Sequence, residues 1–201
     1  MARLTENTEG SSGLSLAIRL QQDSAGAWRD LVALYGPLVK SWVHQAGFRQ
    51  VEAEDIVQDV FLTVHRSIER FDPTVPGATF RGWLWRVTRN AVLQIARKKI
   101  PPARGGSTAQ AHLAEIADAW TDDGAGDPPS TVRDITALLH RAMGQIEAQV
   151  EPLTWDAFVR TVLRGESTED VARALTMSPS AVRKAKSRTL QRLRKQLGDV
   201  L

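Results

Sequence analysis

The chain has 201 residues, of which 42% are hydrophobic and 24% charged, with no cysteine and a formal net charge of +3. The absence of cysteine excludes disulfides, thiolate zinc sites and a cysteine nucleophile, and it fits a reducing compartment. Residues 1–14 lack an apolar core after a basic start, and no stretch approaches the roughly 18 apolar residues of a membrane span. We expect a soluble cytoplasmic protein with a disordered N-terminus over residues 1–14.

Charge is distributed unevenly along the chain. Residues 1–100 sum to +3, residues 101–134 to −4 and residues 135–201 to +4. A chain of this length can bury one sizeable core or two small ones, and the segregation of charge favours two. Two basic parts separated by an acidic one also favour a polyanionic partner such as nucleic acid.

The first predicted domain spans residues 15–99 and begins with a helical run over 28–46. Its apolar residues recur at helical spacing, and Gly47 stands where the run should end. Gly36 and Pro37 interrupt the run, which leaves two alternatives: one kinked helix or two helices. 

A second helix is predicted over residues 52–70, with one apolar face and a stop at Phe71-Asp72-Pro73. The helical wheel places four residues opposite the apolar face: Asp55, Gln58, Asp59 and Leu62. An outward leucine among polar and acidic side chains is a plausible partner patch, although the residues alone favour a solvated helix face with one stray leucine. The loop Asp72–Thr79, with two prolines and a glycine, follows this helix.

The third predicted helix, Phe80–Lys99, contains basic side chains and no acidic ones. Its expected inward arc consists of Phe80, Leu84, Val87, Ala91 and Ile95. Trp83 and Trp85 flank this arc, and the exposed side is expected to hold Arg86, Arg89, Asn90 and Arg97. Aromatic rings beside a cationic strip can stack on unpaired bases while arginines hold phosphates. Core packing of either ring is the alternative.

Residues 100–131 are predicted to be a flexible linker. They contain Pro101-Pro102, Gly105-Gly106 and the acidic string TDDGAGDPPS, a composition that disfavours a packed element. A short amphipathic segment, His112–Trp120, is the exception. The apolar residues of 132–201 again recur at helical spacing, which predicts a second domain of about four helices. The expected fold class is therefore all-α, with two small helical domains joined by the linker.

The last part of the second domain has the pattern of a helix-turn-helix. Ser167 is placed to cap one helix with Asp170 as its capping partner, and Thr176-Met177 is placed at a turn. Ser178 can cap the next helix, with Pro179 at its first position. The wheel of that helix puts basic and polar residues outward: Arg183, Lys184, Ser187, Arg188, Gln191, Arg194 and Lys195. Such a face suits a DNA major groove, and a solvated basic helix is the alternative.

Three strings in order and spacing, AEDIVQDVF, FRGWLWRVTRNAVLQIARK and the terminal helix-turn-helix, resemble sigma factors of the extracytoplasmic-function (ECF) type in the sigma-70 family. The resemblance implies a two-domain initiation factor that recruits core RNA polymerase to promoter DNA. Residues 15–99 would be sigma region 2, which opens the −10 element, and residues 132–201 would be sigma region 4, which reads the −35 element. The resemblance is compatible with an anti-sigma factor as a further partner. It implies no cofactor, no metal and no catalytic residue.

The resemblance also assigns residues. Asp55, Gln58 and Asp59 correspond to the surface that docks on the clamp helices of the largest polymerase subunit, with Leu62 beside them. Asn90 lies where the family has an asparagine near the captured −10 base, and loop 72–79 corresponds to the loop that encloses that base. The −35 contact falls on Ser180, Arg183, Lys184, Ser187 and Arg188.

The sequence departs from the family pattern at three places. Ala185 stands where a basic residue is usual, residues 147–158 replace a shorter and more arginine-rich turn, and the linker is acidic.

The rival interpretation is a two-domain helix-turn-helix regulator that acts without core polymerase. An enzyme is disfavoured, because the four histidines show no metal-ligand spacing and no phosphate-binding glycine loop or nucleophile elbow is present. A protein-interaction module would not explain the segregated charge.

Overall fold

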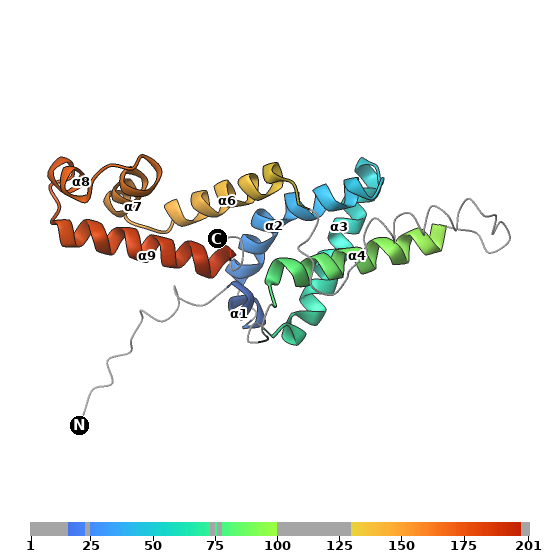
Figure 1. Ribbon diagram of the computed structural model, residues 1–201. Helices are drawn as coiled ribbons and strands as arrows, with labels where there is room; N and C mark the ends of the chain where they lie inside the picture. The colour runs from blue at the N-terminus through green and yellow to red at the C-terminus, as the bar shows by residue number, and fades with distance from the viewer. Residues whose placement is uncertain (1–15, 23–24, 73–74, 76–77, 100–129, 198–201) are drawn as a thin grey trace, which may run out of the picture. The chain divides into compact units, whose positions relative to one another are not determined.

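The computed structural model describes residues 16–22, 25–72, 75, 78–99 and 130–197, and among these residues the regular structure is entirely helical (Figure 1). The expected all-α class is confirmed. No described helix is both long and apolar enough to span a membrane. The predictions for residues 1–14, for most of the linker and for the segment His112–Trp120 lie outside the described residues.

Contacts between Cα atoms divide the chain into two units, one formed by residues 19–138 and the other by residues 1–18 with 139–201. The division falls within a helix, α6 (Val132–Glu147), and not at its start. The functional limits of the two domains, with a boundary at residue 132, stay a prediction.

The first helices of the chain are α1 (Leu16–Gln21) and α2 (Ala25–Gln45). Of the two alternatives around Gly36, the structure has a single helix, with Pro37 inside α2. Gly47 has φ +87° and its N–H donates to the carbonyl of His44 at 2.9 Å. Glycine adopts this left-handed backbone without the cost of a Cβ, which is why α2 ends where the sequence predicts.

Helix α3 (Gln50–Ser67) continues into a 3₁₀ turn, η2 (Ile68–Arg70). The side-chain amide of Gln21 donates to the carbonyls of Ile68 and Phe71, at 3.1 and 2.8 Å, and so satisfies backbone groups that the helix end leaves open. The apolar side of α3 packs on α2, and its buried residues are Ala53, Ile56, Val60 and Val64.

Helix α4 (Phe80–Lys99) has the limits predicted from the sequence. Thr79 precedes it, and its hydroxyl accepts a hydrogen bond from the N–H of Gly82 at 2.9 Å. A Cβ on Gly82 would approach that hydroxyl to 2.8 Å, so glycine keeps the cap unobstructed. Helix α4 packs on both α2 and α3, which gives this unit a three-helix core.

The start of α6 is capped by a reciprocal arrangement of Thr131 and Asp134. The Asp134 N–H donates to the Thr131 hydroxyl at 3.1 Å, and the Thr131 N–H donates to the Asp134 carboxylate at 3.0 Å. Burial alone would raise the pKa of Asp134, but hydrogen bonds from Thr131 and Ser41 and the charge of Arg133 leave it below its ordinary value. The indole N–H of Trp42 on α2 also donates to the Ser130 hydroxyl at 3.3 Å. These bonds place the beginning of α6 with α2.

The remaining helices are α7 (Pro152–Phe158), a π-helical turn η4 (Val159–Leu163), α8 (Thr168–Ala174) and α9 (Pro179–Leu197). Helices α7 and α8 pack on α9. Their buried cluster consists of Ala157, Val171, Ala172, Val182 and Ala185, with Leu175 and Met177 against it. Together with α6, this agrees with the four helices expected from the sequence.

Thr189 is fully buried in α9, and among the described buried side chains its hydroxyl has no hydrogen-bond partner. Valine has nearly the same shape without the polar group. Because an unsatisfied buried hydroxyl is costly, Thr189→Val should raise the free energy of unfolding by about 1 kcal/mol in urea titrations. Thr161→Val is the matched control and should give no gain, because the Thr161 hydroxyl donates to the Ala157 carbonyl at 2.7 Å. A less stable Thr189→Val protein would contradict this interpretation.

Candidate nucleic-acid interface

The outward face of α3 carries the four residues expected there. Asp55, Gln58 and Asp59 are exposed, and Leu62 keeps 46% of its surface accessible. Their spacing of three and four residues brings them onto one stripe of the helix. The stripe presents carboxylates, an amide and one apolar side chain to solvent.

The two tryptophans of α4 lie in different environments, which corrects one prediction. Trp85 is 5% exposed, and its ring meets the buried ring of Trp42 edge-to-face with centroids 5.2 Å apart. It therefore belongs to the core and cannot stack on a base in this fold. Burying this large apolar ring against α2 stabilises the fold more than leaving it exposed to water would.

Helix α4 is rotated relative to the predicted wheel because Trp85 is inside. Its buried face consists of Arg81, Leu84, Trp85, Thr88, Val92, Leu93 and Ala96. Val87, Ala91 and Ile95, which were predicted to be inward, are only half-buried. The Arg81 guanidinium group, although part of the basic segment, is not available on the surface.

Trp83 is half-buried at the edge of an aromatic cluster. Its ring centroid lies 5.5 Å from that of Phe71 and 5.7 Å from that of Phe80. Phe80 in turn contacts the ring of Tyr35 at 5.3 Å. These contacts hold the Trp83 ring in place and leave part of it accessible. Of the other predicted strand-binding residues, Arg86, Asn90 and Arg97 are exposed and Arg89 is half-buried.

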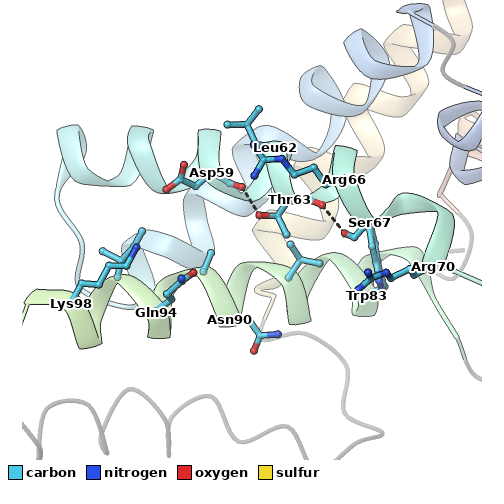
Figure 2. A pocket seen from close by; sticks show the side chains of 13 residues that line it. Asp59, Leu62, Thr63, Arg66, Ser67, Arg70, Trp83, Asn90, Gln94 and Lys98 are labelled. Atoms are coloured by element: carbon cyan, nitrogen blue, oxygen red, sulfur yellow. Dashed lines mark hydrogen bonds between the residues drawn. The ribbon is translucent and has the colours of Figure 1, made fainter.

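A groove of about 560 Å³ runs between α3 and α4 (Figure 2). We call it the α3–α4 groove. Its walls come from both helices and from η2, since Trp83, Asn90 and Gln94 lie on α4, Arg66 on α3 and Arg70 on η2. Asp59 and Leu62 of the α3 stripe also border it, so the structure brings residues of two predicted surfaces to one depression. The other lining residues are Thr63, Ser67, Val87, Ala91, Ile95 and Lys98.

Helix α9 presents a second, convex basic surface. Ser180, Arg183, Lys184, Ser187 and Arg188 are all exposed and follow one another at helical spacing. Helix α9 carries no acidic side chain between Pro179 and Leu197, and the positive end of its dipole lies beside Ser180. Of the predicted outward face, Gln191 and Arg194 are exposed as well, and Lys195 is half-buried.

The turn before α9 is shaped as predicted from the caps. Ser167 accepts a hydrogen bond from the N–H of Asp170 at 3.1 Å, and its hydroxyl donates to the Asp170 carboxylate, which lowers the pKa of Asp170. Ser178 accepts from the N–H of Ala181 at 3.1 Å. Thr176 adopts φ 53°, in the left-handed region that glycine or asparagine more often occupies.

Glu166 orients the loop that enters this helix-turn-helix. Its carboxylate accepts three hydrogen bonds from Arg160, two from Nε at 2.9 and 3.1 Å and one from Nη2 at 2.6 Å. This hydrogen bonding holds the pKa of Glu166 below its ordinary value. Neither residue was predicted to have a role. 

The described residues contain no group of three or more histidine, cysteine, aspartate or glutamate side chains that could hold a metal ion.

Known proteins resemble this chain over most of its length. A family profile described as Sigma-70 region 2 matches residues 31–99, which form most of α2 and all of α3 and α4. RNA polymerase sigma factor CarQ of Myxococcus xanthus is 28% identical over 182 residues, covering 90% of this chain and 95% of the relative. RNA polymerase sigma factor CnrH of Cupriavidus metallidurans is 25% identical over 169 residues, covering 83% of this chain and 84% of the relative.

Residues 31–99 belong to the Sigma-70 region 2 family, and the relatives that match most of the chain are RNA polymerase sigma factors. A shorter match, to ECF RNA polymerase sigma factor SigW of Bacillus subtilis, has 32% identity over 41% of this chain and 44% of the relative. Among solved structures, CnrH in complex with the cytosolic domain of CnrY matches with 22% identity and a TM-score of 0.35, over 89% of this chain and 92% of that one. Sigma factors are initiation factors and not enzymes, as expected from the sequence.

Two features of this sigma factor were missed from the sequence. The capping pair Thr131 and Asp134 has a readable T-x-x-D signal, which would have placed the start of α6. Arg66 and Arg70 give no signal on their own, because only the packing of α3 on α4 brings them to the same groove as Trp83. Ala185, the departure from the family pattern, is buried in the core and offers no atom to DNA.

Proposed function

We propose that this sigma factor binds core RNA polymerase and directs it to promoters with three separate surfaces. The α3 stripe docks on the clamp helices of the largest subunit, the α4 surface holds the opened −10 element, and α9 reads the −35 element. The observation that carries the proposal is the difference between the two basic surfaces. One borders a groove with an aromatic wall, and the other is a convex helix.

The α4 surface suits an unpaired strand. Trp83 offers the accessible part of its ring and Asn90 offers an amide. Arg86 and Arg97, exposed on the same helix, supply positive charge. Stacking of a base on an aromatic side chain contributes roughly 1 to 3 kcal/mol, which can offset the few kcal/mol needed to extrude that base. Loop 72–79 would enclose the base.

The α9 surface suits a duplex. Guanidinium groups form two parallel hydrogen bonds with guanine edges, and the short hydroxyls of Ser180 and Ser187 allow close approach to the groove wall. The helix dipole and the basic side chains are both positive at the start of α9, which favours binding of phosphates there. We place the protein in the cytoplasm with its polymerase, and an anti-sigma partner stays a prediction from the resemblance.

Run-off transcription with and without core polymerase tests this function. We expect promoter-specific transcripts only when the sigma factor and core are both present, on promoters mapped by sequencing transcripts after overexpression. Tight sequence-specific duplex binding by the free chain, with no effect of added core, would instead support a regulator that acts without polymerase.

Arg183→Gln should change the preference for the −35 sequence. An arginine that contacts a base edge contributes about 1–3 kcal/mol of discrimination, or roughly 5- to 150-fold between matched and mismatched promoters. The measurement is transcription by holoenzyme on templates that differ at single −35 positions. Arg194→Gln, an exposed arginine further along α9, is the control and should leave the preference unchanged. Equal weakening by Arg183→Gln on every template would make Arg183 a phosphate contact.

A further inference from the structure

Helix α3 and the turn η2 that continues it contribute two arginines to the α3–α4 groove that the proposed function leaves unassigned. Arg66 and Arg70 are exposed, one helical turn apart, and both line the groove. The ion pairs among the described residues include neither of them. In Figure 2 Arg70 lies beside Trp83, and Arg66 extends along α3 toward Leu62. 

The two walls at this end differ in chemistry. The α4 wall offers Trp83, Val87 and Asn90, which supply an aromatic ring, an aliphatic side chain and an amide. On the α3 wall the hydroxyls of Thr63 and Ser67 donate to carbonyls of their own helix, at 2.9 and 2.6 Å. The guanidinium groups of Arg66 and Arg70 are therefore the donors that this wall has available for a ligand.

We propose that Arg66 and Arg70 bind the phosphates of a single DNA strand whose base lies against Trp83 and Asn90, so that the α3–α4 groove is a two-walled site for that strand. The inference rests on the proposed function, because it takes the opened promoter strand as the ligand. It extends the site from one helix to two and assigns α3, whose outward stripe contacts polymerase, a second role on its neighbouring side.

Charge and size agree with this ligand. Arg66, Arg70 and Lys98 supply three positive charges to the groove, against the single carboxylate of Asp59. A volume of about 560 Å³ is within the roughly 300–1,000 Å³ of sites for nucleotide-sized ligands. The amides of Asn90 and Gln94 provide donors and acceptors for base edges. An apolar peptide helix would leave these amides and two arginines without partners.

The test is the salt dependence of strand binding by holoenzyme that carries Arg66→Gln and Arg70→Gln. Each phosphate neutralised on a single strand contributes about 0.7 to the slope of log K against log salt. Loss of two contacts should therefore reduce the slope by about 1.4, measured by fluorescence anisotropy between about 50 and 200 mM salt. The probe is a fluorescein-labelled single strand spanning the −10 element of a mapped promoter.

Arg29→Gln with Arg49→Gln is the matched control, since both arginines are exposed in the same unit and neither lines the groove. It should keep the slope of the unaltered holoenzyme. If both double variants have that slope while the unaltered holoenzyme binds the strand and initiates, this inference fails and the proposed function stands. If Arg66→Gln with Arg70→Gln abolishes assembly with core instead, the groove is a protein-docking site and the inference is overturned. Strand binding by holoenzyme no tighter than by core alone would remove both proposals.

Discussion

Replacing Trp85 with alanine should destabilise the unit that contains α2, α3 and α4 by about 3–5 kcal/mol. The ring is 5% exposed, sits edge-to-face on Trp42, and lies where α4 packs on α2. Its removal leaves a cavity that surrounding helices fill only in part, and Trp42 loses its aromatic partner. Hydrogen exchange of the α2 and α4 amides, followed by mass spectrometry on the full chain, should show faster opening in both helices.

Trp83→Ala is the matched control for this prediction. Its ring is half-buried and borders the α3–α4 groove. Trp83→Ala should therefore destabilise the fold less than Trp85→Ala does and weaken strand binding more. At roughly 1 to 3 kcal/mol for one stacked base, the affinity of holoenzyme for the −10 strand should fall about 5- to 150-fold. The prediction for Trp85 is wrong if Trp85→Ala keeps normal exchange but loses strand binding, since that pattern belongs to an exposed stacking ring.

Asp59→Lys should weaken association with core polymerase by roughly 30-fold or more, which corresponds to the 2 kcal/mol or more typical of a central charged contact. The side chain is exposed, so the fold should be unaffected beyond about 0.5 kcal/mol. A lysine would also add positive charge to the α3–α4 groove. Loss of transcription therefore could not be attributed to weaker strand binding. Association is measured by titrating fluorescently labelled sigma factor with core.

Two controls make the result specific. Glu69→Lys makes the same change of charge at an exposed position outside the α3 stripe and should leave association with core nearly unchanged. Duplex binding through α9 should be equal in both variants, because α9 belongs to the other unit. A parallel loss of duplex binding in Asp59→Lys would refute the division of labour between α3 and α9.

Most of the helix limits and caps could be predicted from the sequence, because they depend on neighbouring residues. Gly47 ends α2, Ser178 and Pro179 start α9, and Phe80–Lys99 forms α4 as predicted. These signals act through local backbone geometry and through hydrogen bonds three or four residues apart. The outward position of Asp59 follows equally from the helical period.

The fate of the two tryptophans depended on packing that no local signal contains. A wheel gives Trp83 and Trp85 similar places beside the apolar arc, and only contact with Trp42 decides that α4 turns to bury Trp85. The same rotation moves Val87 and Ala91 from the expected core to the α3–α4 groove. Whether these side chains are buried depends on which helix packs against that face of α4.

By itself, the sequence determined where the helices run, which turn shapes the helix-turn-helix, and that Asp59 and Arg183 face solvent. Each of these follows from residues within about one helical turn. The tertiary structure alone decided that Trp85 is core while Trp83 stays partly accessible, and that Arg66, Arg70 and Asn90 line one groove. The physical reason is that burial and the facing of side chains depend on how α2, α3 and α4 pack together, and those partners are far apart in the sequence.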